Sequence, residues 1–182
     1  MFVAVELASV ARQVEEIQSL LRAVAADVNW VRPENFHLTL KFLGATPDER
    51  IESIRQALAR AVSGMEPFEV ELSRVGAFPS PSRARVVWVG LAPERPLVQL
   101  AGRVEDELEG LGVAREERPF AAHVTLGRRR TPRRDEMLQK TLGELTVASG
   151  ARSRIAEAVL MQSHLRPGGP VYTPVARFPF KG

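Results

Sequence analysis

Two short segments of this chain carry nearly the same four residues, HLTL at His37–Leu40 and HVTL at His123–Leu126. The chain contains only three histidines, and these segments use two of them. Histidine titrates near neutral pH, so one imidazole can accept a proton while a second one donates a proton. Threonine hydroxyls and a nearby basic residue can bind phosphoryl oxygens. The paired motifs therefore predict acid–base catalysis of a phosphoryl transfer.

Strand periodicity predicts which side chains share a face, because successive side chains of a strand point to opposite sides. In the first motif the polar side of the strand carries His37, Thr39 and Lys41. In the second motif it carries His123 and Thr125. Each strand is expected to bury its apolar face in the core and to point a His–Thr pair away from that core. Lys41 is the candidate basic residue for binding substrate beside the first pair.

A single histidine on a strand is more often a structural hydrogen-bonding residue than a catalyst. A structural histidine has no reason to recur on the polar face of both strands, so the repeat favours catalysis. His164 has no threonine two residues later and is interpreted as a surface or turn residue. The arginines at 128–130 and 133–134 follow the second motif. Such runs are usually solvated surface, but this one is also a candidate for phosphate contacts because it follows a candidate site.

The elements that must position the motifs are predicted twice in the same order. The first half contains a strand over 2–7, a helix capped by Ser9, a motif strand over 35–44, a helix over 46–62 with Thr46 as its cap, and a strand over 68–75. The second half contains a strand over 84–91, a helix over 95–112, a motif strand over 119–128, a helix over 131–143 opened by Thr131–Pro132, a strand over 154–165, and an edge strand over 171–180 broken by Pro174.

This order indicates an internal duplication on the scale of half a domain. We expect a single compact domain over residues 1–182, built of two lobes at about 2–75 and 84–165 with a C-terminal strand at 171–180. The fold class predicted is α+β, with two βαβαβ lobes related by a pseudo-twofold axis. The sheets are expected to be mainly antiparallel and to surround a central cleft that both motif strands border.

Composition sets the broad class of the protein. The 182 residues suit one domain, and 25 basic against 22 acidic residues give a net charge of +3. The pI of about 9.9 suits a polyanionic partner without requiring one. The absence of cysteine excludes disulfide scaffolds, cysteine nucleophiles and cysteine-based zinc sites. Glu6 interrupts a short apolar run that lacks a basic start, so neither a signal peptide nor a membrane helix is expected, and we predict a soluble, cytoplasmic protein.

The phrases ENFHLTLKFLG, RVVWVGL, RPFAAHVTLGR and GGPVYTPV resemble the RNA 2′,3′-cyclic phosphodiesterase branch of the 2H phosphoesterase superfamily, whose members are also called 2′-5′ RNA ligases. The resemblance spans nearly the whole chain, from Phe2 to about Phe180. It implies a monomeric, bilobal α+β protein whose motifs face each other across a cleft. It also implies hydrolysis of RNA 2′,3′-cyclic phosphate ends, including those of tRNA fragments, to 2′-phosphates without a metal or cofactor. Reversible 2′-5′ RNA ligation belongs to the same resemblance.

Carried over by position, the resemblance makes His37 the proton donor to the 3′-oxygen and His123 the base that activates water. Thr39 and Thr125 would hold the phosphate oxygens. Arg128 matches the basic residue that often closes the second motif in this family, and it is the second candidate for substrate binding. By strand alternation, however, Arg128 falls on the apolar side, so it reaches the cleft only if the strand ends or twists there.

Three alternatives stay open. The first is a different substrate, because paired His–Thr motifs also act on other cyclic phosphates and on ADP-ribose-derived esters in the superfamily. A non-catalytic protein that binds RNA ends would use the basic groove alone, although binding does not need two proton carriers. A two-histidine metal hydrolase is the third alternative, but the sequence has no HExxH and no Asp or Glu near the motifs at ligand spacing.

Overall fold

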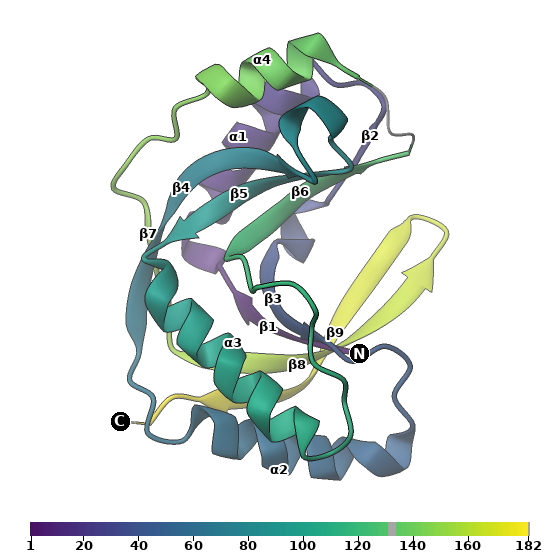
Figure 1. Ribbon diagram of the computed structural model, residues 1–182, viewed down its shortest axis with the longest axis vertical. Helices are drawn as coiled ribbons and strands as arrows, with labels where there is room; N and C mark the ends of the chain where they lie inside the picture. Colours follow the sequence, from purple (N-terminus) through teal and green to yellow (C-terminus); the bar gives the residue numbers. More distant parts are fainter. Residues whose placement is uncertain (131–133, 182) are drawn as a thin grey trace.

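The computed structural model describes residues 1–130 and 134–181, and within them nine strands form one sheet (Figure 1). The sheet order is β7-β4-β5-β6-β3-β1-β8-β9, and β2 pairs with β6 beside this path. All pairs between these strands are antiparallel, which confirms the predicted α+β class. The strands are β1 (Phe2–Glu6), β2 (Val28–Trp30), β3 (His37–Phe42), β4 (Phe68–Phe78), β5 (Val86–Ala92), β6 (His123–Arg129), β7 (Arg152–Ile155), β8 (Glu157–Arg166) and β9 (Gly169–Pro179).

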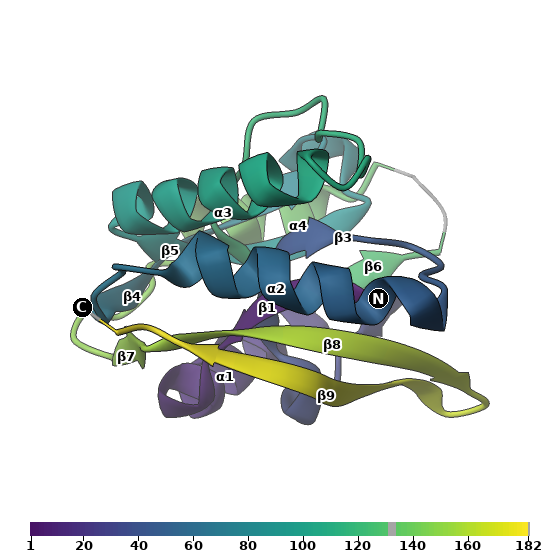
Figure 2. The same ribbon diagram turned by 90° about the horizontal axis from the view of Figure 1, so that it is seen from below.

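The helices pack in two pairs, and each pair takes one helix from each half of the chain. Helices α2 and α3 lie side by side, as Figure 2 shows, and α1 contacts α4 at the opposite end of the molecule. The four helices are α1 (Ala11–Arg22), α2 (Ile51–Val62), α3 (Glu94–Glu109) and α4 (Glu136–Glu144). Four short 3-10 turns complete the described elements: η1 (Ala8–Val10), η2 (Pro33–Asn35), η3 (Asp48–Arg50) and η4 (Pro81–Arg83).

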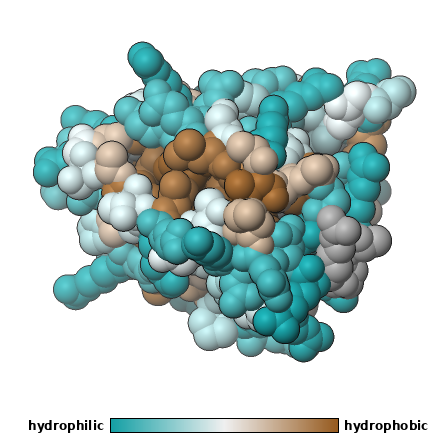
Figure 3. Space-filling view, turned by 90° about the horizontal axis from the view of Figure 1, so that it is seen from above, coloured by the Kyte–Doolittle hydropathy of each residue, from teal (hydrophilic) through white to brown (hydrophobic). Residues whose placement is uncertain are grey.

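The apolar stripe of each helix packs against the sheet and builds the core. In α3 the leucine and valine side chains at helical spacing are fully buried, because 3.6 residues per turn bring them to one face. None of the helices in residues 1–130 and 134–181 is long and apolar enough to cross a lipid bilayer. The surface at the α4 end is mainly hydrophilic and surrounds a central apolar patch (Figure 3).

The two halves of the chain exchange their last strands. Strand β4 pairs with β5 and β7, whereas β8 pairs with β1 and β9. The sheet thus has two four-stranded sections, β7-β4-β5-β6 and β3-β1-β8-β9, which meet where β6 lies beside β3. Because each section contains strands from both halves, the sections do not coincide with the segments 2–75 and 84–165. The duplication behind those segments stays a prediction.

The first two helices do not begin as predicted. Ser9 lies inside η1 and makes no cap hydrogen bond to α1, and η3 precedes α2. Pro47 keeps an extended backbone with ψ of 147°, so the chain cannot turn into a helix before Asp48. The Thr46 hydroxyl instead donates to the carbonyl of Gly44 at 3.4 Å. The prediction that Thr46 caps this helix is therefore wrong.

The second half differs from the prediction at two places. The helix expected over 131–143 begins at Glu136, and the Asp135 side chain caps it by accepting a first-turn backbone N–H at 3.0 Å. The predicted start at Thr131–Pro132 lies outside the described residues. The strand expected over 154–165 is split at Ala156, because β7 pairs with β4 while β8 crosses to pair with β1.

Candidate active site

A cavity of about 360 Å³ lies where the two sheet sections meet. It contains four of the residues singled out in the sequence, namely His37 and Thr39 from β3 and Thr125 and Arg128 from β6. Tyr172 reaches it from β9. The remaining lining residues are Met1, Phe2, Val31, Asn35, Phe42, Gly44 and Ser163.

The pairing of β3 with β6 explains how the two motifs come together. The central residues of the motifs, Leu38 and Val124, are antiparallel partners. Continuing this register by one residue in each direction puts the histidine of each motif in line with the threonine of the other. His123 does not line the cavity itself, but it is near enough for its charge to lower the pKa of His37.

The two histidine rings are oriented in the same way by the backbone. The Nδ1 atom of His37 lies 2.7 Å from the carbonyl oxygen of Asn35, and Nδ1 of His123 lies 2.7 Å from that of Ala121. A carbonyl oxygen only accepts, so Nδ1 carries the proton in both rings. Each neutral ring therefore has a free lone pair on Nε2. The Thr39 hydroxyl lies 3.1 Å from Nε2 of His37 and donates to it when that ring is neutral.

Both histidines have a pKa below the ordinary value of 6.5. For His37 burial is the main cause, and the charges of His123 and Arg128 lower the pKa further, against the carbonyl of Asn35, which raises it. For His123 burial is again the main cause, and Arg128 adds to it. Without a ligand, both rings are therefore mainly neutral at pH 7. A phosphate anion bound between them would offset Arg128 and favour a protonated ring.

The shared influence of Arg128 gives a pH prediction. The Arg128→Gln substitution removes a positive charge that lowers both histidine pKa values, so both values should rise. The two limbs of the kcat/KM profile follow the free-enzyme pKa values. We expect both limbs to move to higher pH, whatever happens to the maximum rate. Arg130→Gln is the control, since Arg130 is exposed and bonds to Asn29. A profile that moves on neither limb or on one limb alone would contradict this coupling.

A β-bulge changes the faces of the first motif strand. Two consecutive residues of β1 pair with Lys41 and Thr39, so Leu40 is an extra residue between them. Such an insertion puts two successive side chains on one side of the strand. Leu40 and Lys41 are consequently both buried, and Phe42 returns to the side of the histidine and lines the cavity.

The second motif strand has a bulge at the equivalent position. Two consecutive residues of β5 pair with Gly127 and Thr125, which leaves Leu126 as the extra residue. The side chain of Arg128 is thereby turned towards the cavity, where it stands at the position equivalent to Phe42. Strand alternation alone would put Arg128 on the apolar side. The bulge at Leu126 is the local change of direction that brings its side chain to the site instead.

Contacts with β2 and α1 hold this second bulge in place. A Cβ atom on Gly127 would lie 2.4 Å from the Val28 side chain, so only glycine allows β2 to cross at this point. The carbonyl of Leu126 accepts hydrogen bonds from the Gln18 side chain and from the backbone N–H of Val31, both at 2.9 Å. The bulged carbonyl is thus fully satisfied inside the protein, as a buried polar group requires.

Lys41 does not reach the cavity. Its side chain is 2% exposed, forms an ion pair with Glu105 of α3, and lies 3.6 Å from the carboxylate of Glu116. Its ammonium group also donates to the carbonyl of Ala114 at 2.7 Å. The expected orientation of Lys41 beside the His–Thr pair is wrong, because the bulge shifts the alternation by one residue.

Three aromatic residues of the cavity were not anticipated as site residues. The ring of Tyr172 meets the His37 ring edge to face with centroids 5.2 Å apart, and Phe2 lies 4.9 Å from the same ring. Phe42 is 58% exposed in the cavity wall. Aromatic rings beside a phosphate-binding site suit the stacking of a nucleobase. Phe42 lies two residues after the first motif, and this closeness was the one signal that the sequence offered.

No group of three or more His, Asp or Glu side chains within residues 1–130 and 134–181 has an arrangement that could hold a metal ion. The groups that the site does bring together are two imidazoles that can transfer protons, and an arginine and two threonines that can bind an anion.

Comparison with known proteins gives consistent sequence matches. The family described as LigT like Phosphoesterase matches this chain twice, over residues 5–88 and 89–172. A Methanothermobacter thermautotrophicus protein named RNA 2′,3′-cyclic phosphodiesterase is 35% identical over 178 residues, which are 97% of this chain and 96% of that protein. A protein of the same name from Archaeoglobus fulgidus is 36% identical over 94% of this chain and 95% of its own length.

Solved structures agree with the sequence matches. Escherichia coli LigT complexed with 3′-AMP has a TM-score of 0.80 and 27% identity, covering 100% of this chain and 97% of the LigT chain. Protein TT0787 of Thermus thermophilus has a TM-score of 0.81 and 28% identity with the same coverage.

Proposed function

Since the chain belongs to the family of LigT-like phosphoesterases, we propose that it hydrolyses the 2′,3′-cyclic phosphate at the end of an RNA to a 2′-phosphate. The names of its relatives support this activity. The observation that carries the proposal is the matched pair of imidazoles, each with Nδ1–H on a backbone carbonyl and Nε2 left for proton transfer. Binding alone would not require two such groups.

In the proposed mechanism the phosphorus lies between the two Nε2 atoms. His123 takes a proton from water as the water oxygen bonds to phosphorus. The bond from phosphorus to the 3′-oxygen breaks on the opposite side, and His37 gives its proton to that oxygen. Thr39 and Thr125 bind the non-bridging oxygens, and Arg128 neutralises part of their charge. The division of roles between the two histidines follows the family resemblance.

The cavity of about 360 Å³ suits the terminal nucleoside of the substrate. The leaving 3′-oxygen belongs to the ribose of that nucleoside, so the ribose must lie on the side of the proton donor His37. Tyr172 and Phe42 stand on this side and offer rings for a base to stack on. Stacking of this kind tolerates any base, because every base has a π face.

The proposed function is tested by incubating the protein with a short RNA that ends in a 2′,3′-cyclic phosphate. We expect conversion to the 2′-phosphate at the same rate with and without a chelator. Binding without turnover would favour the RNA-end-binding alternative, and loss of turnover with the chelator would favour a metal hydrolase. Faster turnover of an ADP-ribose-derived cyclic ester or another cyclic phosphate would favour a different substrate. RNA ligation, a monomeric state and a cytoplasmic location stay predictions.

A further inference from the structure

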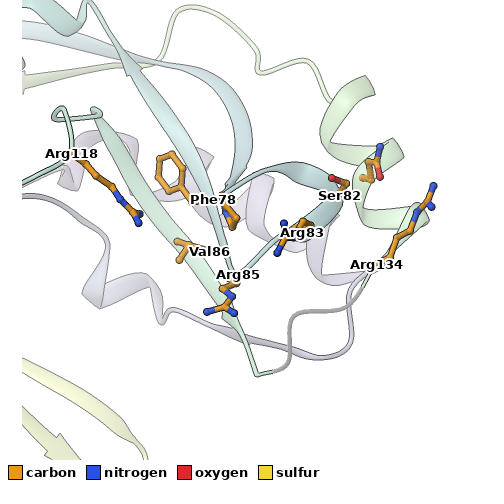
Figure 4. Close-up of a pocket in the computed structure, with 9 residues that line it drawn as sticks. Phe78, Ser82, Arg83, Arg85, Val86, Arg118 and Arg134 are labelled. Atoms are coloured by element: carbon orange, nitrogen blue, oxygen red, sulfur yellow. The ribbon is translucent and has the colours of Figure 1, made fainter.

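The β8–β9 hairpin contributes to the surroundings of His37 but not to those of His123. Its end projects from the body of the molecule (Figure 1), and two of its residues, Ser163 and Tyr172, line the cavity that contains His37. Beside His123 the aromatic neighbour is Phe78, whose ring meets the imidazole edge to face with centroids 5.1 Å apart. Phe78 lines a separate hollow of about 910 Å³ together with several arginines (Figure 4), and the described lining of that hollow includes no residue of β8 or β9.

One buried side chain ties this hairpin to the segment that carries His37. Asn35 is 8% exposed, and its Nδ2 atom donates a hydrogen bond to the carbonyl oxygen of Pro170 in β9 at 2.9 Å. A buried amide needs a partner of this kind. Proline has no N–H, so the carbonyl is the only backbone group by which Pro170 can be held.

The same residue holds the imidazole through its backbone. The carbonyl oxygen of Asn35 accepts the Nδ1 proton of His37 at 2.7 Å, and the backbone N–H of Asn35 donates to the carbonyl of Arg32 at 2.9 Å. The Arg32 guanidinium donates to the carbonyl of Gly168 at the tip of the hairpin. Asn35 therefore fixes the imidazole with one group and the hairpin with another.

Both hydrogen bonds act close to the rings of the site. His37 follows Asn35 by two residues, and Tyr172 follows Pro170 by two residues. The rings of Tyr172 and His37 meet edge to face with centroids 5.2 Å apart. The hydrogen bond between Asn35 and Pro170 thus helps to set the distance between the ring available for stacking and the imidazole.

The second motif holds its histidine without such a side chain. Ala121 stands two residues before His123, as Asn35 stands before His37, and its carbonyl oxygen also lies 2.7 Å from Nδ1 of the imidazole. The methyl side chain of Ala121 cannot form a hydrogen bond, and the residue is exposed. A backbone carbonyl is therefore enough to orient an imidazole, so the buried amide of Asn35 has a purpose that belongs to the His37 side.

We propose that Asn35 is a positioning residue that couples the β8–β9 hairpin to the proton donor. This inference rests on the proposed function, in which the ribose and its base lie on the His37 side. A base stacked on Tyr172 brings the 3′-oxygen of its ribose to a fixed place. The Asn35 carboxamide keeps Nε2 of His37 at the distance from which it protonates that oxygen. Asn35 acts through the hairpin and the imidazole, and transfers no proton itself.

The test is a double-mutant cycle on the hydrolysis of a short RNA that ends in a 2′,3′-cyclic phosphate. We expect Asn35→Ala to lower kcat at least about 10-fold, because a misplacement of about 1 Å at a reacting group can cost about 100-fold. In a Tyr172→Ala background the same substitution should cost less than about three-fold, since the hairpin then has no ring to position. Asn29→Ala is the matched control and should change kcat less than about two-fold. Asn29 is the only other asparagine of the chain, is exposed and does not line the cavity.

A second variant separates the hydrogen bond from the shape of the side chain. Asn35→Asp keeps the volume, but a carboxylate cannot donate to the carbonyl of Pro170. Measured at its own pH optimum, this variant should lose about as much kcat as Asn35→Ala. It also provides the measurement if the alanine variant does not fold.

A second substrate separates positioning from a general loss of structure. Bis(nitrophenyl) phosphate releases nitrophenolate, which leaves without a proton. Asn35→Ala should therefore lower its turnover less than about three-fold, whereas general damage to the site would lower the turnover of both substrates equally.

Several results would overturn the inference. Equal losses on both substrates, or an undiminished cost in the Tyr172→Ala background, would show a purely structural role for Asn35. Failure of both Asn35 variants to fold would show the same. Near-normal hydrolysis of RNA in either variant would refute the inference and leave the proposed function intact. Wild-type protein that does not hydrolyse RNA ends would refute both.

Discussion

Replacing either His37 or His123 with alanine should lower the turnover of a 2′,3′-cyclic phosphate RNA about 10²–10⁴-fold, the usual range for loss of a general acid or base. The reason is that each ring has its Nδ1–H on a backbone carbonyl, which leaves Nε2 for proton transfer, and both rings belong to the paired strands β3 and β6. Steady-state kinetics on a short RNA measures the effect. Near-normal turnover in both variants would refute the two-histidine mechanism.

Three further variants serve as controls for this prediction. Thr39→Ala and Thr125→Ala should cost less than loss of a histidine, because each removes one hydrogen bond to phosphate. His164→Ala should have no effect on turnover, since His164 is exposed on β8 and does not line the cavity.

A substrate with an activated leaving group separates the roles of the two histidines. A nitrophenolate leaves without a proton, so His37→Ala should be largely rescued on such an ester if the ester binds in the same orientation. His123→Ala should stay impaired, because water must still lose a proton. The ratio of turnover on the ribose cyclic phosphate to turnover on the activated ester measures this rescue for each variant. Rescue of the His123 variant instead would reverse the assignment.

The second large effect concerns stability. Replacing Glu105 with alanine should lower the free energy of unfolding by about 3–5 kcal/mol, because it removes the main counter-charge of a buried lysine. The Lys41 side chain is 2% exposed, and the remaining carboxylate near it, that of Glu116, is 3.6 Å away and largely exposed. Denaturant-induced unfolding measures the loss.

A double variant and a surface pair make this stability prediction specific. Lys41→Met/Glu105→Leu replaces both charges with apolar side chains and should recover most of the loss, as it leaves no unpaired buried charge. Glu107→Ala breaks an exposed pair with Arg60 and should cost less than about 1 kcal/mol. If Glu105→Ala costs no more than Glu107→Ala, the buried ion pair does not stabilise the fold in the way we describe.

Much of the molecule follows from local patterns in the sequence. Alternation and helical spacing predicted the motif strands and the helices α1 to α3, because burying an apolar face requires those periods. The helix starts were predicted less well, because a 3-10 turn precedes each of the first two helices and the Thr46 hydroxyl donates to the carbonyl of Gly44 instead of capping α2. The short strand β2 was missed, because three residues are too few to show a period.

The sequence by itself determined that two His–Thr pairs lie on strands with one apolar face each, and hence what chemistry to look for. Only the tertiary structure decided which neighbours join them. A bulge at Leu40 and another at Leu126 turn Phe42 and Arg128 into the cavity and Lys41 away from it. A bulge arises from pairing with the next strand, so alternation along a single strand cannot reveal it. The same holds for two other features. The exchange of β4 and β8 and the contact of Tyr172 with His37 both depend on distant parts of the chain, so no local spacing encodes them.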